Sequence, residues 1–245
     1  GLLRRQRQMC IRDRYIGVAF DSKVESFRNE IYNEYKSSKN IDKEILDQFP
    51  LAEKVTELLG LTLLPMDHYE ADDAIASVCE LFKNENVEII IGSLDKDLMQ
   101  CLNVKNISMY STRYKSFTTG DDVYKKFGVH PHQIPDFLAL VGDSSDGIPG
   151  MNGIGEKTAS ALLQEYENIE NIYQNLNIWK NNIRSGERHA NTIFENYELL
   201  KLFKSLTTLR VDVKVPKKIE KYSLSKLSSD ELQKFSAKYQ LNINF

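Results

Sequence analysis

Cysteine is scarce in this sequence, and the spacing of the few cysteines excludes two classes of protein. The 245 residues contain three cysteines, Cys10, Cys79 and Cys101, and none of them forms a CxxC pair. We therefore expect reduced thiols, with neither a disulfide framework nor a cysteine-bound zinc site. The four histidines are too scattered along the chain to suggest a zinc site of their own.

Long apolar runs and an excess of basic charge are also missing. No apolar run approaches the length that spans a membrane, so we expect no membrane association. The net charge is −3, and no basic excess signals a nucleic-acid ligand, although metal-binding carboxylates would cancel basic residues elsewhere. The hydrophobic content of 41% and the aromatic content of 10% argue against disorder and suit one large domain or two small ones.

The first fourteen residues, GLLRRQRQMCIRDR, are basic and lack the apolar stretch of a signal peptide. A transit peptide or a nucleic-acid-binding arm would fit this composition. We favour a third interpretation, in which the segment resembles a translated sequencing-adapter fragment and the native protein begins upstream. Residues 1–14 are therefore treated as a non-native leader and excluded from the expected fold.

Short apolar runs alternate with helical patterns in the first half of the chain. Apolar spacing predicts helices over residues 45–59 and 70–82. The apolar VEIIIG run is typical of a strand that is buried on both faces. The alternation predicts a parallel α/β sheet, and the pattern from about Asp121 onward predicts successive helices, the last from Ser228 or Ser229. The expected strands are YIGVAF (15–20), LTLL (61–64), VEIIIG (87–92) and NISMY (106–110).

Acidic residues gather where the expected strands end. The carboxyl ends of parallel strands form one rim, where functional sites usually lie. Any one of these acids alone is explained as a helix cap, but eight acids at one rim would repel one another strongly unless divalent cations bound them. We therefore predict a site for hard ions such as Mg²⁺ or Mn²⁺. The acids are Asp21 after the first strand, Glu70, Asp72 and Asp73 after the second, Asp95 and Asp97 after the third, and Asp143 and Asp146 before a glycine-rich turn.

The glycine-rich turn GIPGMNGIGEKTASALL (147–163) is expected to open a helix at about Glu156. Glycines let backbone amides approach a phosphate, the helix N-terminus adds partial positive charge, and Lys157 adds a full charge. A tight turn that serves only packing is the other interpretation of one GxG pair. The longer run matches a helix–hairpin–helix motif that binds the DNA backbone. DSSDG does not fit an EF-hand loop that starts at Asp143. Such a loop needs an oxygen ligand at position 5, where Gly147 stands, and a glutamate at position 12, where Ile154 stands.

A stretch of basic and aromatic residues follows the first strand. It contains Arg28, Lys36 and Lys39 together with Tyr32 and Tyr35. Such a stretch is either a solvated helix or a surface that positions a single strand through phosphate contacts and stacking. A nucleic-acid phosphodiester is the one ligand that would use the acids, the turn and this stretch together.

These motifs follow the order of one known family. FDSK and FRNEIYNEYK, then YEADD, SLDKDL, VGDSSDGIPG and GIGEKTA, resemble the 5′–3′ exonuclease domain of bacterial DNA polymerase I and its free-standing relatives in the flap endonuclease superfamily. The resemblance is strong from Tyr15 to Leu163 and weak beyond. It implies that residues 15–142 form a PIN-like α/β nuclease core, which includes a helical arch. A mostly helical region with a helix–hairpin–helix, of the helix–two-turn–helix type, would follow over residues 143–245.

The resemblance also implies roles for individual residues. The metal ligands would be the eight acids named above. Arg28 and Lys36 would act on the scissile phosphate from the arch. DNA contacts would come from Arg28, Tyr35 and Lys36 and from the loop residues Gly153, Ile154, Gly155, Glu156, Lys157 and Thr158. A potassium ion would be held by carbonyls around Leu140, Val141, Pro149, Met151 and Ile154.

Two features depart from the pattern of that family. Gly147 stands where many members have Asn. The family also begins with a strand that ends in an Asp-Gly pair, some tens of residues before FDxK, and Asp13 lies too close to Asp21 to take that part. We therefore expect the chain as written to lack its first strand and one metal ligand, and to be weakly active or inactive. Restoring that segment is expected to rescue Mg²⁺-dependent cleavage.

The function implied by the resemblance is hydrolysis of DNA phosphodiesters by two Mg²⁺ or Mn²⁺ ions in replication and repair, with a possible role for K⁺. The partners would be DNA with a 5′ flap, a nick or a free 5′ end, and a fused or separate DNA polymerase. We expect a cytoplasmic, nucleoid-associated monomer. Two alternatives stay open. A PIN-type ribonuclease is disfavoured by the helix–hairpin–helix, and a non-catalytic protein that binds DNA structures is disfavoured by the intact acids.

Overall fold

The computed structural model describes residues 15–21, 25–37, 43–225 and 229–239. Lys39 and residues 1–14, which enter the expectations above, lie outside these described residues. The chain divides into two units, and each is made of segments that are separated in the sequence. Unit 1 comprises residues 1–26, 40–74 and 213–245, and unit 2 comprises residues 27–39 and 75–212. The units interleave along the chain. The expected domain division at residue 142 stays a prediction.

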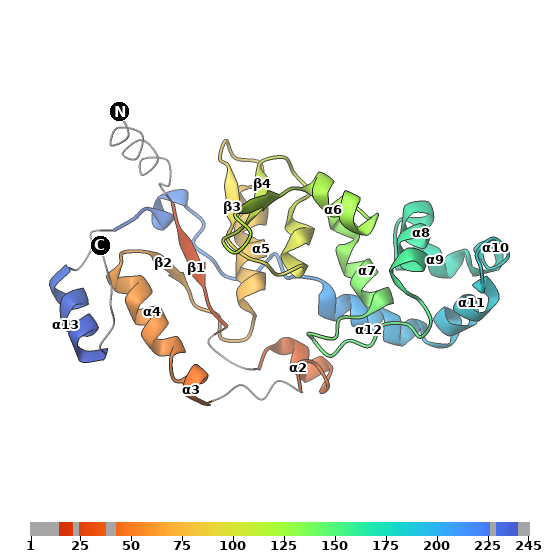
Figure 1. The fold of residues 1–245 in the computed structure, drawn as a ribbon, viewed down its shortest axis with the longest axis horizontal. Helices are drawn as coiled ribbons and strands as arrows, with labels where there is room; N and C mark the ends of the chain where they lie inside the picture. The colour runs from red at the N-terminus through yellow and green to blue at the C-terminus, as the bar shows by residue number, and fades with distance from the viewer. Residues whose placement is uncertain (1–14, 22–24, 38–42, 226–228, 240–245) are drawn as a thin grey trace. The chain divides into compact units, whose positions relative to one another are not determined.

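Unit 1 contains a parallel pair of strands, β1 (Gly17–Ala19) and β2 (Thr62–Leu64), with Gly17 opposite Thr62. Helices α3 (Lys43–Leu46) and α4 (Phe49–Leu58) precede β2, and α13 (Ser229–Tyr239) packs against α4 (Figure 1). The single helix predicted over residues 45–59 is two helices in the structure. The break has a local cause, because Pro50 in the first turn of α4 has no amide hydrogen to continue the helix from α3.

The segment after Val213 closes the amino-terminal end of the β1–β2 pair. It contains the short helix η3 (Ile219–Tyr222), and Figure 1 shows this blue segment at the end where β1 begins. The Ile16 amide donates to the Tyr222 carbonyl at 2.8 Å, and the Thr62 hydroxyl donates to the Lys221 carbonyl at 2.6 Å. Residues far apart in sequence therefore complete one small structure.

The Tyr222 side chain is buried, and its hydroxyl donates to the Pro216 carbonyl at 3.0 Å. Burial raises the pKa of Tyr222 from 10.0 to about 12. The folded state therefore holds this proton more tightly than the unfolded chain, and the corresponding stability is present below pH 10 and lost as the pH rises from 10 to about 12.

We expect Tyr222→Phe to remove this alkaline loss. The free energy of unfolding of the variant should fall less than that of the wild type between pH 10 and about 12, measured by urea denaturation at a series of pH values. Tyr114→Phe, at a tyrosine that is 67% exposed, is the control and should behave as the wild type does. Equal slopes for all three proteins would contradict the assignment.

Unit 2 contains a three-stranded sheet of β3 (Ile89–Ile91), β4 (Ile107–Ser111) and β5 (Ser116–Thr118). Strands β3 and β4 are parallel, whereas β4 and β5 are antiparallel, and β5 was not predicted from the sequence. The prediction that the VEIIIG strand is buried on both faces is wrong. Strand β3 lies at an edge of the described sheet, and Ile90 is 50% exposed.

Most of unit 2 is helical, as predicted for the second half of the chain. None of the helices among the described residues is long and apolar enough to cross a membrane. In chain order they are α2 (Phe27–Ile31), α5 (Ala71–Phe82), which begins in unit 1, η1 (Asp97–Cys101), α6 (Gly120–Phe127), η2 (Pro131–Gln133), α7 (Ile134–Val141), α8 (Glu156–Tyr166), α9 (Ile169–Gln174), α10 (Leu176–Trp179), α11 (Gly186–Glu195) and α12 (Tyr197–Thr207).

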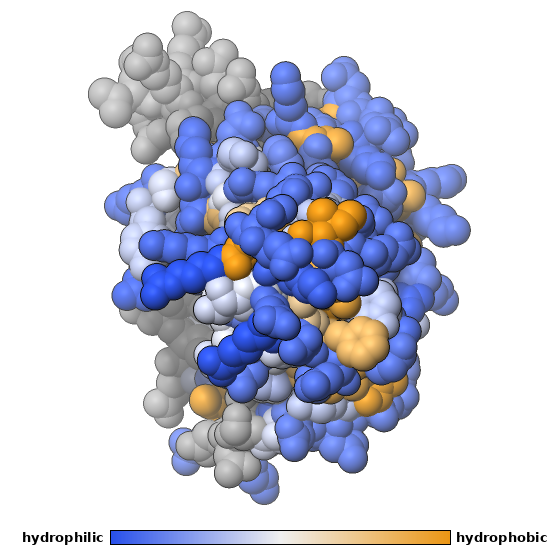
Figure 2. Space-filling model, turned by 90° about the vertical axis from the view of Figure 1, so that its right-hand side faces the viewer, coloured by the Kyte–Doolittle hydropathy of each residue, from blue (hydrophilic) through white to orange (hydrophobic). Residues whose placement is uncertain are grey.

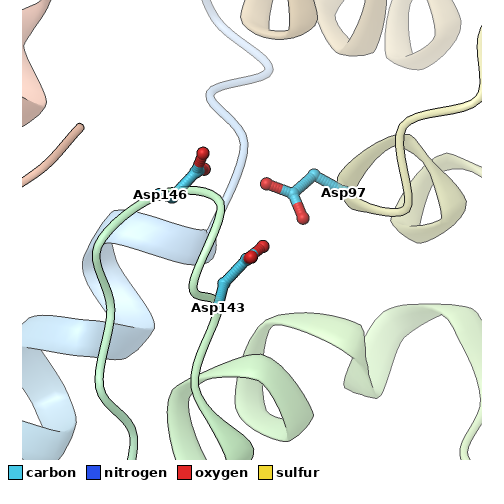
Figure 3. A group of neighbouring side chains, drawn as sticks. All are labelled: Asp97, Asp143 and Asp146. Atoms are coloured by element: carbon cyan, nitrogen blue, oxygen red, sulfur yellow. The ribbon is translucent and has the colours of Figure 1, made fainter. Parts of the chain in front are cut away.

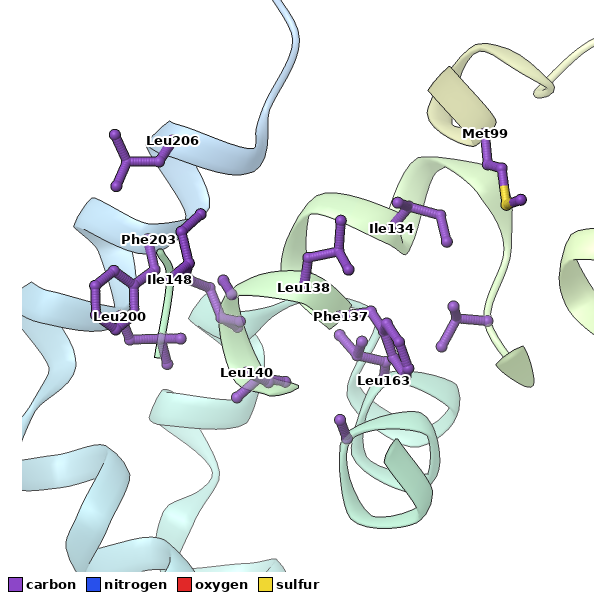
Figure 4. Packing of buried hydrophobic residues seen from close by; sticks show 14 of the residues in the cluster. Met99, Ile134, Phe137, Leu138, Leu140, Ile148, Leu163, Leu200, Phe203 and Leu206 are labelled. Carbon is purple, nitrogen blue, oxygen red and sulfur yellow. The ribbon is translucent and has the colours of Figure 1, made fainter. Parts of the chain in front are cut away.

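Helix α7 is the centre of packing in unit 2. Every residue from Ile134 to Leu140 is buried, and helices α8 and α12 pack against α7. Figure 4 shows Phe137 of α7 close to Leu163 of α8, and Leu138 and Leu140 on the same helix. Burial of each such side chain contributes about 1.5–3 kcal/mol. This packing fixes the carboxyl end of α7, from which the DSSDG loop leaves.

A buried charge network joins three of these helices. The Lys204 ammonium of α12 lies 2.8 Å from Asp136 Oδ1 of α7 and 2.8 Å from Glu170 Oε2 of α9. The Ile169 amide at the start of α9 also donates to Asp136 Oδ1, at 3.1 Å. Burial raises the pKa of Asp136, although the hydrogen bond and charge of Lys204 oppose the rise.

Candidate metal centre and nucleic-acid interface

Three carboxylates from two distant segments of unit 2 converge on one point. Asp97 begins η1 after strand β3, and Asp143 and Asp146 lie in the loop that follows α7. Oxygen atoms of the three side chains all lie within 4.8 Å of one another (Figure 3). The side chains are largely buried, with 3% of Asp143, 8% of Asp146 and 9% of Asp97 exposed. We call this group the acid triad.

The loop after α7 is shaped so that Asp143 and Asp146 face the same side. The Asp143 amide donates to the Ile148 carbonyl at 2.7 Å, and the Ile148 amide returns a hydrogen bond to the Asp143 carbonyl at 2.8 Å. The Ser145 hydroxyl and amide both donate to Asp143 Oδ1, at 2.5 Å and 2.9 Å. These bonds fix the Asp143 side chain before any ligand arrives.

Gly147 holds this loop against the segment that follows α2. Its φ is +73°, and a Cβ at this position would lie 2.7 Å from the Glu34 carbonyl oxygen. The adjacent Lys36 amide donates to the Asp146 carbonyl at 2.9 Å. The departure from the family pattern at this position therefore has a local reason, since glycine permits the close approach of the Glu34 backbone.

We expect Gly147→Ala to lower the free energy of unfolding by about 1–3 kcal/mol, because alanine adds both a left-handed backbone penalty and the contact with Glu34. Urea denaturation measures the change. The control is Gly92→Ala, where an added Cβ meets nothing within 4 Å, and its effect should stay below about 0.5 kcal/mol. Equal losses for the two variants would show that the close approach is unimportant.

Two lysines and a tyrosine surround the acid triad. Lys96 Nζ lies 3.0 Å from Asp143 Oδ1, and Lys36 Nζ lies 3.9 Å from Asp146 Oδ1. The Tyr35 hydroxyl donates to Asp146 Oδ2 at 3.2 Å. Burial would raise the pKa of Asp143, but the hydrogen bonds from Ser145 and Lys96 outweigh burial and hold that pKa below its ordinary value. Asp143 is therefore ionised over the whole neutral range.

The donor set fits a hard divalent cation. Three carboxylates against two ammonium groups leave one formal negative charge, and all the candidate ligand atoms are oxygens. Carboxylates this close repel one another, and a bound cation reduces that repulsion. The acid triad is thus suited to a hard divalent cation rather than to a soft metal.

The acids of unit 1 lie around the start of helix α5. Asp21 Oδ1 accepts a hydrogen bond from the Ala71 amide at 2.6 Å, and Asp73 Oδ2 accepts one from the Glu70 amide at 3.0 Å. Glu70 Oε1 accepts from the Ser26 hydroxyl at 3.2 Å. Helix capping, the simpler explanation, therefore applies to Asp21 and Asp73. The convergence of all eight acids at one rim stays a prediction.

Asp72 and Asp95 are less buried than the acid triad. Asp72 lies in the first turn of α5 and is half-buried. Asp95 is exposed, and its Oδ1 accepts a hydrogen bond from the Asp97 amide at 3.0 Å. Asp95 thus caps the turn that begins η1 and orients the backbone of Asp97.

The glycine-rich turn ends in an open helix N-terminus. Helix α8 begins at Glu156, as predicted, with Gly155 as its N-cap residue. Gly153, Gly155, Glu156 and Lys157 are exposed, Thr158 is half-buried and Ile154 is buried in the core. Because a Cβ at Gly155 would meet nothing within 4 Å, a phosphate has room to reach the amides of this turn.

The carbonyls predicted to hold potassium are partly occupied by backbone hydrogen bonds. The Leu140 carbonyl accepts from the Met151 amide at 2.8 Å, and the Met151 carbonyl accepts from the Ile154 amide at 3.0 Å. A carbonyl oxygen has a second lone pair, so these bonds do not exclude a cation. The potassium site, with Val141 and Pro149 as its other members, stays a prediction.

Arg28 and Tyr35 occupy different positions from those expected of DNA-contacting side chains. Each is only 1% exposed. The Arg28 guanidinium donates to the Leu206 carbonyl at 2.8 Å and the Thr208 carbonyl at 3.1 Å, so it caps the carboxyl end of α12. A ring as buried as that of Tyr35 cannot stack on a base. Lys36 and the Tyr35 hydroxyl both lie beside Asp146 of the acid triad.

A cleft of about 450 Å³ lies beside the DSSDG loop, residues 143–147. Its size is within the range of small-ligand sites. The molecular face in Figure 2, which looks onto the end of unit 2 that carries α8 to α11, is mostly hydrophilic with scattered apolar side chains. Such a surface suits a polar ligand better than an apolar partner. The cleft is lined by Glu34, Val141, Gly142, Ser144, Gly147, Ile148 and Pro149.

Sequence reasoning missed Lys96 and Ser145, which hold Asp143 in place. The signal for Lys96 was available, because it stands between Asp95 and Asp97 in the DKD motif. The signal for Ser145 was weaker, since a serine in a turn next to aspartate is common.

Two family models together match residues 3–230 of the chain. The model described as the 5′-3′ exonuclease N-terminal resolvase-like domain matches residues 3–128, and the model described as the 5′-3′ exonuclease C-terminal SAM fold matches residues 129–230. The chain belongs to the 5′-3′ exonuclease family. The expected fold class is confirmed, with a PIN-like, resolvase-like core followed by a helical region of the helix–hairpin–helix type. The models meet at residues 128 and 129, before the expected division at residue 142.

Relatives of this exonuclease-family chain include free-standing enzymes and longer polymerases. A 5′-3′ exonuclease of Aquifex aeolicus is 38% identical over 197 residues, which are 80% of this chain and 67% of the relative. A DNA polymerase I of Caldicellulosiruptor bescii is 36% identical over 213 residues, 84% of this chain. The chain spans only 24% of the length of that polymerase.

The fold is shared with a solved phage nuclease. The structure of the bacteriophage T5 flap endonuclease in a pseudo-enzyme–product complex with DNA and metal ions has a TM-score of 0.61. It is 20% identical, and the similarity covers 91% of this chain and 80% of that one. At this identity the comparison establishes the fold of the exonuclease family for this chain.

Proposed function

We propose that this exonuclease-family chain hydrolyses DNA phosphodiesters near the 5′ end, at 5′ flaps, nicks or free 5′ ends. The acid triad is the observation that carries the proposal, because three largely buried carboxylates within 4.8 Å keep a net negative charge beside two lysines, which a bound cation would offset. The similar T5 flap endonuclease was crystallised with DNA and metal ions, which supports the same ligands here.

The described residues would take different roles in such a reaction. Two divalent cations, Mg²⁺ or Mn²⁺, would supply a water of lowered pKa and charge stabilisation when bound by Asp97, Asp143 and Asp146 and by the predicted further ligands Asp21, Glu70, Asp72, Asp73 and Asp95. Lys96 and Ser145 keep Asp143 ionised and oriented. Lys36 lies where its charge would offset that of the phosphoryl oxygens. The exposed turn before α8 and Lys157 would hold the DNA backbone.

The wider setting follows from this proposal. The proposed protein partner is a DNA polymerase, either fused or separate, because a relative of this chain is a DNA polymerase I. A potassium ion at the carbonyls of the glycine-rich turn would steady the DNA contact. A monomer acting on chromosomal DNA would work in the cytoplasm.

The proposal is tested by incubating labelled 5′-flap, nicked and RNA substrates with Mg²⁺ or with EDTA. We expect the flap and nicked DNA to be cleaved only with Mg²⁺, at the low rate expected above for this chain, and the RNA to remain intact. Tight binding without cleavage would favour a non-catalytic protein that binds DNA structures. Cleavage of RNA in preference to DNA would favour a ribonuclease, and either result would overturn the proposal.

Lys157 provides a prediction about binding. We expect Lys157→Ala to weaken DNA binding and to lower the slope of log affinity against log salt concentration by about 0.9, because one fewer phosphate is neutralised. Cleavage at saturating DNA should be unchanged. The control is Lys126→Ala, another exposed lysine of unit 2, on helix α6. If both variants bind with the wild-type slope, the turn does not contact phosphates.

A further inference from the structure

A row of lysines lies in unit 1, in the segment KVPKKIEK that spans residues 214–221. Lys214, Lys217, Lys218 and Lys221 are all exposed. No ion pair engages any of these four ammonium groups within the part of the chain that the structure describes. Glu220 is the one acid inside the segment, so its formal charge is +3. In a chain whose net charge is −3, this is a strong local excess. We call residues 214–221 the basic segment.

The backbone of the basic segment is held firmly although its lysine side chains point outward. Tyr222 is 4% exposed and its hydroxyl donates to the Pro216 carbonyl at 3.0 Å. The Tyr222 and Lys221 carbonyls accept from Ile16 and Thr62, as described above. A charge presented on a fixed backbone loses less entropy on binding than one on a free tail. The segment therefore has the character of a preformed surface.

The carboxyl-terminal end of the basic segment, at Lys221, lies at the opposite end of β1 from the unit 1 acids. Ile16, next to the segment, precedes β1, and Asp21 follows it (Figure 1). Five residues of extended chain separate Ile16 from Asp21, which corresponds to about 16 Å. Lys221 therefore does not neutralise these acids, and no ion pair engages the other three lysines among the described residues, so the charge of the segment is available to a ligand.

The chemistry of the basic segment fits a polyphosphate better than a protein. Lysine is a strongly hydrated point charge on a flexible stem, and it is depleted from the buried centres of protein interfaces. A phosphate backbone lets such ammonium groups stay hydrated while condensed counterions are released. Lysine contacts to phosphates position a duplex without reading its sequence.

We propose that the basic segment is a second DNA-binding surface, which contacts the sugar–phosphate backbone of duplex DNA through Lys214, Lys217, Lys218 and Lys221. It adds to the predicted contact at the turn before α8. The choice of DNA as the polyanion rests on the proposed function, whereas the binding itself requires neither a metal ion nor cleavage.

The test compares two fourfold variants that remove the same charge. In the first, the four lysines of the basic segment are replaced by glutamine. In the control, Lys43, Lys54, Lys105 and Lys126, which are exposed lysines on other elements, are replaced by glutamine. Binding of a labelled duplex is measured by fluorescence anisotropy in EDTA over a range of salt concentrations, and circular dichroism establishes that each variant is folded.

We expect the slope of log affinity against log salt to fall by about 2–4 for the basic-segment variant, since each lost phosphate contact removes about 0.9. The slope of the control should change by less than about 1. If the fourfold variant does not fold, the pair Lys217→Glu and Lys218→Glu is used and should lower the affinity by at least about 10-fold at moderate salt. Equal slopes for the two fourfold variants would overturn the proposal. Binding of polyglutamate, a model of an acidic protein, is measured in the same way. If the basic-segment variant lost polyglutamate binding but bound DNA as the wild type does, the proposal would also be overturned.

The result is separable from that for the proposed function. Mg²⁺-dependent cleavage by the wild type with equal salt slopes would overturn the second surface alone. If the salt slope falls for the basic-segment variant but the wild type cleaves no DNA, the second DNA-binding surface is supported and the proposed nuclease function is contradicted.

Discussion

Replacing Asp97 by asparagine is expected to lower the rate of Mg²⁺-dependent DNA cleavage by about 1,000-fold. Asparagine keeps the size of the side chain but removes one of the three charges that would hold a divalent cation within the acid triad. Charge stabilisation by a catalytic metal contributes several kcal/mol to the transition state, and each 1.36 kcal/mol corresponds to about 10-fold in rate. Affinity for DNA in EDTA should change by less than about 3-fold.

The measurement pairs single-turnover cleavage with a direct metal titration, for example by isothermal calorimetry with Mn²⁺. The control is Asp121→Asn, an exposed aspartate in the first turn of α6, which should leave both readouts unchanged. If Asp97→Asn lost DNA affinity and turnover to the same extent, the triad would have a binding role rather than a metal-binding one. Unchanged Mn²⁺ affinity would also contradict the assignment.

Replacing Lys204 by methionine is expected to lower the free energy of unfolding by about 3 kcal/mol. Methionine keeps the apolar stem, but Asp136, with 7% of its side chain exposed, loses the partner 2.8 Å away. Removing one partner of a buried ion pair typically costs 3–5 kcal/mol, and we take the lower end because 27% of the Lys204 side chain is exposed. Lys201→Met, at a surface pair with Glu198, is the control and should have little effect.

The pH dependence of this loss has a defined sign. The pKa of Asp136 is already raised by burial and should rise further without Lys204. A carboxyl with a raised pKa in the folded state stabilises that state when protonated, so the stability is present at low pH and is lost as the pH rises through the folded pKa. The deficit of Lys204→Met should therefore shrink on acidification. The double variant with Asp136→Asn should recover stability at neutral pH and lose this dependence, and a deficit independent of pH would contradict the network.

Much of the fold could be predicted from the sequence, because its signals are local. The strand before Asp21, the helix beginning near Glu156 and the last helix from Ser229 all lie where periodicity and turn residues place them. The family followed from motif order. The break between α3 and α4 was also local, and Pro50 offered its signal in advance.

The positions that sequence reasoning misjudged depend on distant contacts. The sequence pattern predicts that Arg28 is a surface residue of a basic stretch. It is buried instead, because its guanidinium donates to the distant carbonyls of Leu206 and Thr208. Ile90 reads as core, yet it is exposed at the edge of the described sheet. Within the site, the meeting of Asp97 with Asp143 and Asp146 was expected only if the glycine-rich turn folded over the rim where the strand before Asp97 ends, and the bond from Lys96 to Asp143 needed coordinates.

The interleaving of the two units has a consequence for how this protein is made. The chain passes from one unit to the other near residues 26, 39, 74 and 212. Strand β1 leaves the ribosome long before Tyr222, so the hydrogen bond from Ile16 to Tyr222 waits until unit 2 has been translated. Unit 2 can gather its own core earlier, so a stalled or shortened nascent chain would expose an incomplete unit 1, the kind of species that chaperones capture.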